Sequence, residues 1–215
     1  MSIMSYCIKA KYAFLDLLYP HGLSCAVCDE DSLPLSSGVC SDCAPLLPKP
    51  PVPRHDIPSI RSLYAPFVYE EPIRRLIHDF KYNNKRYLAH FFAREMIPYL
   101  PACDWLCPVP LHKLRKKQRG YSQTNLLGEA LMITGQAAYS LPILERIRDT
   151  PSQTKLNREQ RKTNVQNAFY ITKNVRAKTI CLIDDVATTG TTLDECAKTL
   201  LAAGAKQVDA CVIAF

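Results

Sequence analysis

The stretch of this chain that decides its fold is Ile180-Cys181-Leu182-Ile183-Asp184-Asp185-Val186-Ala187-Thr188-Thr189-Gly190-Thr191-Thr192. Four apolar residues precede two adjacent carboxylates, and threonines around one glycine follow, a pattern that predicts a buried strand leading into a loop. From residue 192 to 204 apolar residues recur at helical spacing, which predicts an amphipathic helix. A strand, a loop and a helix in this order line the ligand-binding edge of an open parallel α/β sheet.

The chemistry of this loop indicates what the edge binds. Backbone N–H groups and threonine hydroxyls at a helix start suit a phosphate. The candidate phosphate-binding residues are Thr188, Thr189, Gly190, Thr191 and Thr192. Asp184 and Asp185 can accept hydrogen bonds from two neighbouring hydroxyl groups, so the stretch describes a site for a ribose 5-phosphate. It is neither a Walker loop nor a three-glycine dinucleotide loop. The alternative is an ordinary strand–turn–helix unit whose acidic pair only caps the sheet edge.

Length and hydropathy limit the class of protein. The 215 residues suit one α/β domain with a small additional module. No uncharged apolar stretch reaches about 18 residues, so we expect no membrane insertion. Lys9, Lys11 and Asp16 interrupt the apolar residues near the N-terminus, and no small-residue cleavage site follows. We therefore expect a cytoplasmic protein without a secretory signal.

Basic residues gather in the middle of the chain. Residues 61–123 carry 12 Lys and Arg against 5 Asp and Glu. Residues 1–60 carry 4 against 6, and residues 124–215 carry 11 against 9. The basic excess of the middle part attracts phosphates, on a small ligand or on nucleic acid. The alternative is a solvated basic face without a specific partner.

Four of the ten cysteines form two C-x-x-C knuckles, Cys25-Ala26-Val27-Cys28 and Cys40-Ser41-Asp42-Cys43. The residues between the knuckles supply almost no apolar side chains for a hydrophobic core. The two knuckles together supply four thiolates for the tetrahedral coordination of a metal ion. The sequence therefore predicts a structural zinc at Cys25, Cys28, Cys40 and Cys43. Four thiolates leave no open coordination position, which argues against a catalytic zinc. A redox dithiol pair is the alternative, and the other six cysteines are expected to be small hydrophobic fillers.

Six prolines between residues 45 and 58 predict an extended linker and hence a division of the chain. Residues 1–60 would contain a short helix at 6–18, the four-cysteine module and the linker, and residues 61–215 would form the main α/β domain. In that domain we expect strands at 62–69, at 105–109 and near Ile143, Phe169, Cys181 and Val212. We expect one helix that begins at Pro72 and two more at 87–99 and 123–133.

Two polar loops of the main domain carry candidate ligand-binding residues. The loop after the strand at 105–109 contains Lys113, Arg115, Lys116, Lys117 and Arg119, a cluster that would stabilise a departing pyrophosphate. The loop at 149–164 contains Arg161 and has the length of a lid or binding loop. The alternatives are a generic basic loop and a disordered insertion.

Together these segments resemble the ComF competence proteins and their GntX-like relatives, a branch of the type I phosphoribosyltransferase superfamily. Residues 180–192 resemble the phosphoribosyl pyrophosphate signature of that superfamily. Besides the cysteine knuckles, the resemblance includes Phe80-Lys81-Tyr82, Pro108-Val109-Pro110-Leu111-His112, Arg119-Gly120-Tyr121-Ser122-Gln123, Thr150-Pro151-x-Gln153 and Arg161-x-x-Asn164-Val165-x-x-Ala168-Phe169. Ser122 stands where the family usually has Asn, and Asn167 where Gly is common.

The resemblance implies a parallel sheet flanked by helices, preceded by the four-cysteine zinc module, with phosphoribosyl pyrophosphate and Mg²⁺ as ligands. Asp184 and Asp185 would orient the ribose, Thr188 to Thr192 would hold the 5-phosphate, and Arg161 would close the lid. The remaining ligand-binding residues would be Lys81, Lys113, Arg115 and Arg119.

The resemblance leaves two functions open. One is a phosphoribosyltransferase of unknown acceptor that acts in DNA uptake and natural transformation. The other is a non-catalytic competence factor that binds single-stranded DNA beside a helicase-like partner and uses the fold as a ligand-regulated scaffold. Aromatic residues among the basic ones would then stack on bases, although Phe91 and Phe92 are expected to pack in the core.

Overall fold

The computed structural model describes residues 24–31, 38–50, 57–111, 117, 120–133, 139–147 and 168–215. The helix expected at 6–18, the loop at 149–164 and the basic loop except Lys117 and Gly120 lie outside these residues. Among the described helices, none is both long enough and apolar enough to cross a bilayer.

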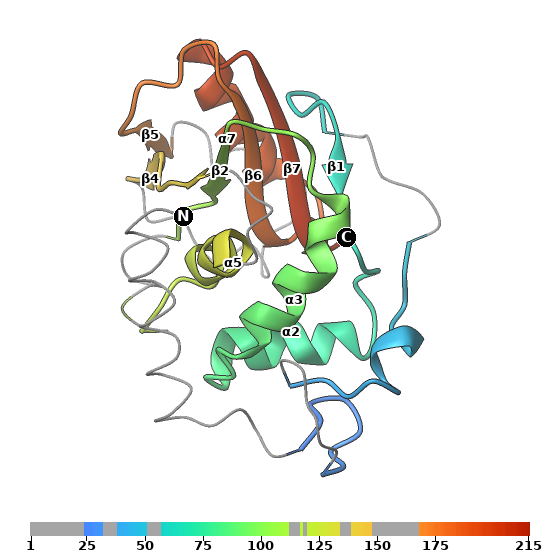
Figure 1. Ribbon diagram of the computed structural model, residues 1–215. Coiled ribbons are helices and arrows are strands. Elements are labelled where there is room, and N and C mark those ends of the chain that lie inside the picture. Colours follow the sequence, from blue (N-terminus) through green and yellow to red (C-terminus); the bar gives the residue numbers. More distant parts are fainter. Residues whose placement is uncertain are drawn as a thin grey trace.

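A five-stranded sheet forms the centre of the protein (Figure 1). Its strands, in spatial order, are β1 (Leu63–Tyr64), β7 (Gln207–Ala214), β6 (Thr179–Val186), β2 (Trp105–Pro108) and β3 (Tyr139–Ser140). All neighbouring pairs in this sheet are parallel. The long strands β6 and β7 are largely apolar because helices cover both of their faces. The predicted α/β fold with a parallel sheet is therefore confirmed.

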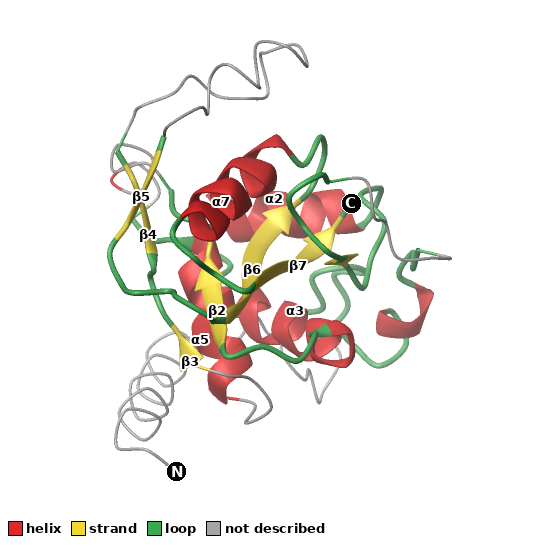
Figure 2. Ribbon diagram, turned by 90° about the horizontal axis from the view of Figure 1, so that it is seen from above, coloured by secondary structure: helices red, strands yellow, loops and turns green. Residues whose placement is uncertain are grey.

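Alternate residues of the central strands divide the core into two clusters. The helices that cover the sheet are α2 (Ile73–Tyr82), α3 (Leu88–Met96), α5 (Gln123–Ile133) and α7 (Thr191–Ala202). Cys181 and Ile183 pack with α2, α3 and α5, whereas Ile180 and Leu182 pack with α7. Figure 2 shows α7 on one side of the sheet and α3 and α5 on the other. This arrangement leaves the start of α7 at the carboxyl end of β6.

Prolines explain two differences between the expected and the observed elements. The strand expected at 62–69 is reduced to β1 and a single bridge from Phe67 to Ala214. Pro66, between them, has no N–H to donate to the ladder. The helix expected at 87–99 ends as α3, and a 3₁₀ turn at Ile97–Tyr99 follows, in which Pro98 cannot donate an α-helical hydrogen bond. β3 was not expected, since two residues carry no periodicity.

A separate two-stranded antiparallel sheet lies beside the main one (Figure 2). Its strands are β4 (Leu144–Arg146) and β5 (Phe169–Ile171), as the apolar residues near Ile143 and Phe169 predicted. Leu144 and Phe169 are buried in the same cluster as the apolar face of α7. The small sheet therefore packs close to the loop that precedes α7.

The cysteine knuckles pack against α2 and are followed by a 3₁₀ turn at Ala44–Leu46. Cys25 and Cys40 are buried in the same apolar cluster as α2 and α3. Arg75 of α2 donates through Nη2 to the carbonyl of Val27 at 2.5 Å and to that of Ala26 at 3.4 Å. In Figure 1 the blue segment that carries the first knuckle lies below α2. These contacts fix the module directly to the helix that carries Lys81.

Candidate functional site

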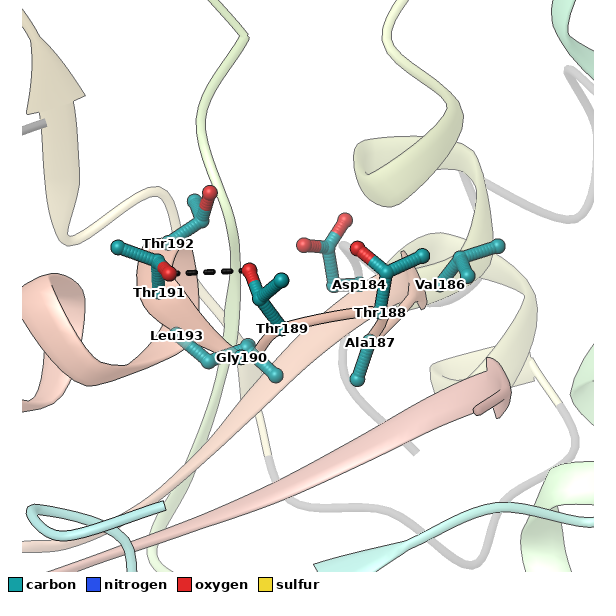
Figure 3. A pocket seen from close by; sticks show the side chains of 9 residues that line it. All are labelled: Asp184, Val186, Ala187, Thr188, Thr189, Gly190, Thr191, Thr192 and Leu193. Atoms are coloured by element: carbon teal, nitrogen blue, oxygen red, sulfur yellow. Dashed lines mark hydrogen bonds between the residues drawn. The ribbon is translucent and has the colours of Figure 1, made fainter. Parts of the chain in front are cut away.

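The loop between β6 and α7 forms a small hollow at the carboxyl end of the sheet (Figure 3). The hollow is lined by Asp184, Val186, Ala187, Thr188, Thr189, Gly190, Thr191, Thr192 and Leu193. The side-chain oxygens of Asp184, Thr188, Thr189 and Thr192 point to the same side of the loop. The hydroxyls of Thr189 and Thr191 lie 2.9 Å apart. Together with the N–H groups at the start of α7, these hydroxyls provide donors for an anion.

Gly190 determines the shape of this loop. Its φ of +69° lies in the left-handed region, which glycine adopts at low cost. A Cβ at this position would lie 2.5 Å from Cδ1 of Ile57, so the Ile57 side chain would have to shift to admit a larger residue. Nearby, the N–H of Ser59 donates to Oδ1 of Asp194 in the first turn of α7 at 3.0 Å. The segment after the proline-rich linker therefore braces the loop, a contact that the sequence analysis did not predict.

Asp184 and Asp185 lie near the end of β6 and are partly buried. The N–H of Asp185 donates to Oδ1 of Asp184 at 2.8 Å. Burial and the adjacent charge of Asp185 raise the pKa of Asp184 to about 7, against the opposing charges of Lys81 and Arg146. Donors from a ligand would offset this cost of holding negative charge. The carboxylate oxygens are also the kind of ligand that Mg²⁺ prefers, so the donor set fits that ion.

Lys81 is brought directly to the acidic pair. Its ammonium nitrogen lies 2.7 Å from Oδ1 of Asp185, and the two side chains are only 18% and 13% exposed. The segment that follows the basic loop holds the end of α2 that carries Lys81. The Tyr121 hydroxyl donates to the carbonyl of Phe80, and Nε2 of Gln123 donates to the carbonyl of Lys81 at 3.3 Å. Two motifs that the sequence analysis treated separately therefore meet at the site.

The other basic candidates lie outside the described residues: Lys113, Arg115, Arg119 and Arg161. The ends of the basic loop are nevertheless placed. The N–H of Val109 donates to the carbonyl of Ile183 at 2.9 Å, directly before Asp184. The hydroxyl of Thr124 donates to the carbonyl of Val109 at 2.8 Å. Both ends of the basic loop are thus fastened at the sheet edge that carries the acidic pair, and Lys117 within the loop is exposed.

Arg146 of β4 is a residue near the site that the sequence analysis missed. It is 7% exposed, and its guanidinium carbon lies 5.8 Å from the centre of the Phe169 ring. Its charge acts to lower the pKa of Asp184, against the effect of burial. The signal was an arginine within the strand pattern around Leu144, but the pattern does not show which carboxylate the arginine approaches.

The four knuckle cysteines form a cluster that could hold a metal ion. Their Sγ atoms all lie within 4.8 Å of one another, and those of Cys28 and Cys40 are 4.0 Å apart. Four thiolates around a tetrahedral ion with bonds of about 2.3 Å would lie about 3.8 Å apart, so the observed spacing fits. The N–H groups of Val27 and Cys40 point to Sγ of Cys25 at 3.4 and 3.3 Å. Although burial opposes it, these backbone donors lower the pKa of Cys25 to about 6.

The remaining described cysteines are placed as apolar fillers. Cys107, Cys181, Cys196 and Cys211 are buried in the two core clusters, and Cys103 is partly buried. Burial raises the pKa of each of these thiols, which keeps them protonated and unreactive. Their expected packing role is confirmed.

Comparison with known proteins gives the family. Residues 126–215 match the phosphoribosyl transferase domain. The chain is 30% identical to the DNA utilization protein YhgH of Salmonella typhimurium over 215 positions, which cover 96% of this chain and 87% of that protein. It is 32% identical to Competence protein F of Haemophilus influenzae, over 65% of this chain and 66% of that protein. It is 31% identical to Competence protein ComFC of Streptococcus pneumoniae, over 67% of this chain and 64% of that protein.

A solved structure of the allosteric regulatory enzyme of purine biosynthesis aligns with 60% of this chain and 26% of its own, at 18% identity. The TM-score of this alignment is 0.39. The relatives, the matched domain and the cysteine cluster agree with the motifs on which the resemblance was based. The chain therefore belongs to the ComF family of competence and DNA utilization proteins, within the type I phosphoribosyltransferase superfamily.

Proposed function

We propose that this protein binds phosphoribosyl pyrophosphate with Mg²⁺ at the loop between β6 and α7, and that it acts in DNA uptake or utilization. The observation that carries the proposal is that Asp184 and the threonine loop line one hollow, and that Asp185 follows Asp184 in β6. A 5-phosphate and a ribose diol need these two kinds of partner together. The names of the relatives support the role in competence and DNA utilization.

Each part of the ligand has a partner in this proposal. The hydroxyls and N–H groups of Thr188 to Thr192 bind the 5-phosphate, and Asp184 and Asp185 accept hydrogen bonds from the ribose hydroxyls. Mg²⁺, when bound, would supply positive charge that offsets the charge of the pyrophosphate. The basic loop, with Lys113, Arg115 and Arg119, binds the pyrophosphate oxygens. Arg161 belongs to the loop that closes over the ligand and excludes water.

The same arrangement suits transfer of the phosphoribosyl group to a nitrogen nucleophile. The bond between C1 and the pyrophosphate oxygen breaks, and its electron pair leaves with the pyrophosphate. The lone pair of the nitrogen nucleophile then forms the new bond to C1, and the proton that the nitrogen loses passes to water. The basic loop stabilises the departing charge, so the reaction requires little general-base catalysis. Since a fold and a ligand site do not establish turnover, pyrophosphate release with nucleobases, amines and DNA as acceptors is the measurement that tests transfer.

A second candidate is a non-catalytic factor that binds single-stranded DNA. The observation that favours it is the exposed face of α2, where Tyr82 is 58% exposed and its ring centre lies 4.9 Å from that of His78. Arg74 is exposed four residues before His78 on the same helix, so a cation lies on the helix face that carries the two rings. By contrast, Phe91 and Phe92 are buried, which confirms their expected packing role. Weaker, less salt-dependent DNA binding after Arg74→Gln would support this function, and unchanged binding would reject it.

We infer that the metal in the cysteine cluster is a structural zinc, within a module formed by residues 1–60 and followed by the phosphoribosyl-binding domain at 61–215. All four donors are thiols, which zinc prefers, and together they leave no coordination position for a substrate. Among the described residues around the knuckles, the only buried apolar side chains besides the cysteines are those of Ala26, Val39 and Leu47, so the ion would supply much of the folding free energy of this part. Stoichiometric zinc by elemental analysis, lost in Cys25→Ser, is the expected result.

Calorimetric titration with phosphoribosyl pyrophosphate and Mg²⁺ tests the proposed function. The wild type should bind one equivalent, and the double variant Asp184→Asn/Asp185→Asn should lose this binding. Asp194→Asn is the matched control, because Asp194 lies in the first turn of α7 but is engaged by Ser59 and Lys198. It should retain ligand affinity within about threefold. Wild-type protein that binds no ligand while remaining folded would reject the proposal.

A further inference from the structure

Lys81 occupies a position where a cation bound by the acidic pair would lie. Its ammonium nitrogen is 2.7 Å from Oδ1 of Asp185, a distance at which the two charges are in direct contact. Both side chains are mostly shielded from water, so the attraction is less screened than at an exposed surface. Asp184 precedes Asp185 in β6, and the charge of Asp185 reaches Asp184 and acts to raise its pKa.

The position of Lys81 is held by several contacts and is not that of a free surface lysine. Tyr121 and Gln123 bind the carbonyls of Phe80 and Lys81, as described above. The residues on either side are also fixed. Asp79 accepts from Nδ2 of Asn83 at 2.7 Å and pairs with the Lys85 ammonium at 2.7 Å, which secures the last turn of α2.

Two neighbouring carboxylates without Lys81 would be a good ligand set for a free divalent cation. Carboxylate oxygens are the preferred ligands of Mg²⁺ and Mn²⁺, and two carboxylates that repel each other favour the binding of a cation. With the ammonium in place, an incoming divalent ion meets a positive charge at the carboxylate it would bind. A sugar hydroxyl is neutral and donates a hydrogen bond, so it meets no such repulsion.

We propose that Lys81 is a specificity-determining residue that keeps the acidic pair for sugar hydroxyls and excludes divalent cations that arrive alone. Mg²⁺ then enters the site only together with the phosphates of the ligand. This inference rests on the proposed function, because it names the form in which the site accepts phosphoribosyl pyrophosphate. In this proposal Lys81 acts through the charge that it places at Asp185, in addition to any attraction that it exerts on phosphate.

The test is Mn²⁺ binding to zinc-loaded protein without any phosphoribosyl ligand, measured by the loss of the paramagnetic resonance signal of free Mn²⁺. The wild type and Lys81→Arg, which keeps the charge, should take up little Mn²⁺. Lys81→Gln should bind one equivalent at least about tenfold more tightly, since the repelling charge is gone. Adding Asp185→Asn to Lys81→Gln should abolish that gain, which places the ion on the acidic pair.

The proposal is overturned if wild type and Lys81→Gln bind Mn²⁺ within twofold of each other while both remain folded by circular dichroism. It is also overturned if Lys81→Arg gains affinity as Lys81→Gln does, since charge would then not be the cause. A titration of the same wild-type preparation with phosphoribosyl pyrophosphate reports on the proposed function separately. Failure of that titration would leave the Mn²⁺ result intact as the test of Lys81.

Discussion

Replacement of Asp184 by asparagine should make the folded protein more stable at neutral and alkaline pH. Burial and the charge of Asp185 raise the pKa of Asp184 in the folded state from 3.8 to about 7. A carboxyl group with a raised pKa favours folding at low pH, where it is protonated, and this contribution is lost as the pH rises towards 7. Above pH 7 the folded state therefore carries an ionised group in an unfavourable position, and asparagine removes that charge.

The magnitude follows from the change in pKa. Each pKa unit is worth about 1.4 kcal/mol, so ionisation of Asp184 costs the folded state about 4 kcal/mol at pH 8. This value already includes the attraction of Lys81 and Arg146, and the asparagine amide oxygen can still accept from the N–H of Asp185. We expect a net gain of about 2 to 4 kcal/mol in the free energy of unfolding at pH 8, falling below about 2 kcal/mol at pH 5.

Urea unfolding of both proteins at pH 5 and pH 8, with zinc present throughout, measures this difference. Asp194→Asn is a control of opposite sign. Although burial opposes it, hydrogen bonds from Lys198 and Ser59 lower the pKa of Asp194, so its contribution is present at neutral pH and lost in acid. That variant should be less stable than the wild type at pH 8. If Asp184→Asn were destabilised at pH 8, or if its effect were the same at both pH values, the reasoning about the acidic pair would be wrong.

Three further outcomes are expected. Gly190→Ala should lower the free energy of unfolding by about 1 to 2 kcal/mol, because alanine at φ +69° is strained and its Cβ meets Ile57. In urea unfolding, the double variant Gly190→Ala/Ile57→Ala should regain the part of this free energy that the clash with Ile57 costs. Removal of the metal with a chelator should weaken ligand binding in calorimetry, because Arg75 ties the first knuckle to α2. Arg75→Met should make ligand binding less sensitive to the chelator. Equal sensitivity of the wild type and Arg75→Met would argue against this connection. Tyr121→Phe should cost about 1 kcal/mol in urea unfolding, since the carbonyl of Phe80 loses its buried partner, and no loss would show that this bond is dispensable.

Local patterns predicted the elements that carry the ligand loop. β6, the threonine loop and α7 follow from a short stretch in which hydrophobic period and turn chemistry agree. α2 was equally clear because its buried stripe of Ile73, Leu76, Ile77 and Phe80 recurs at helical spacing. β3 could not be predicted, because a two-residue strand is made by its neighbours in the sheet and not by its own sequence.

The contacts between distant segments could not be predicted from the sequence. Lys81 was assigned to the ligand through the family resemblance alone, and only the fold shows that it touches Asp185. Arg146 looked like one arginine among many, since its effect on Asp184 depends on how β4 packs beside the main sheet. The bond from Ser59 to Asp194 joins residues 135 positions apart, and no periodic pattern records such a pair.

The most direct measurement of the central claim is a crystal structure of the zinc-loaded protein with phosphoribosyl pyrophosphate and Mg²⁺. The account predicts the 5-phosphate within hydrogen-bond distance of the hydroxyls and N–H groups of Thr188 to Thr192, and the ribose hydroxyls on Asp184 and Asp185. A ligand bound elsewhere, with the hollow between β6 and α7 filled only by water, would contradict it.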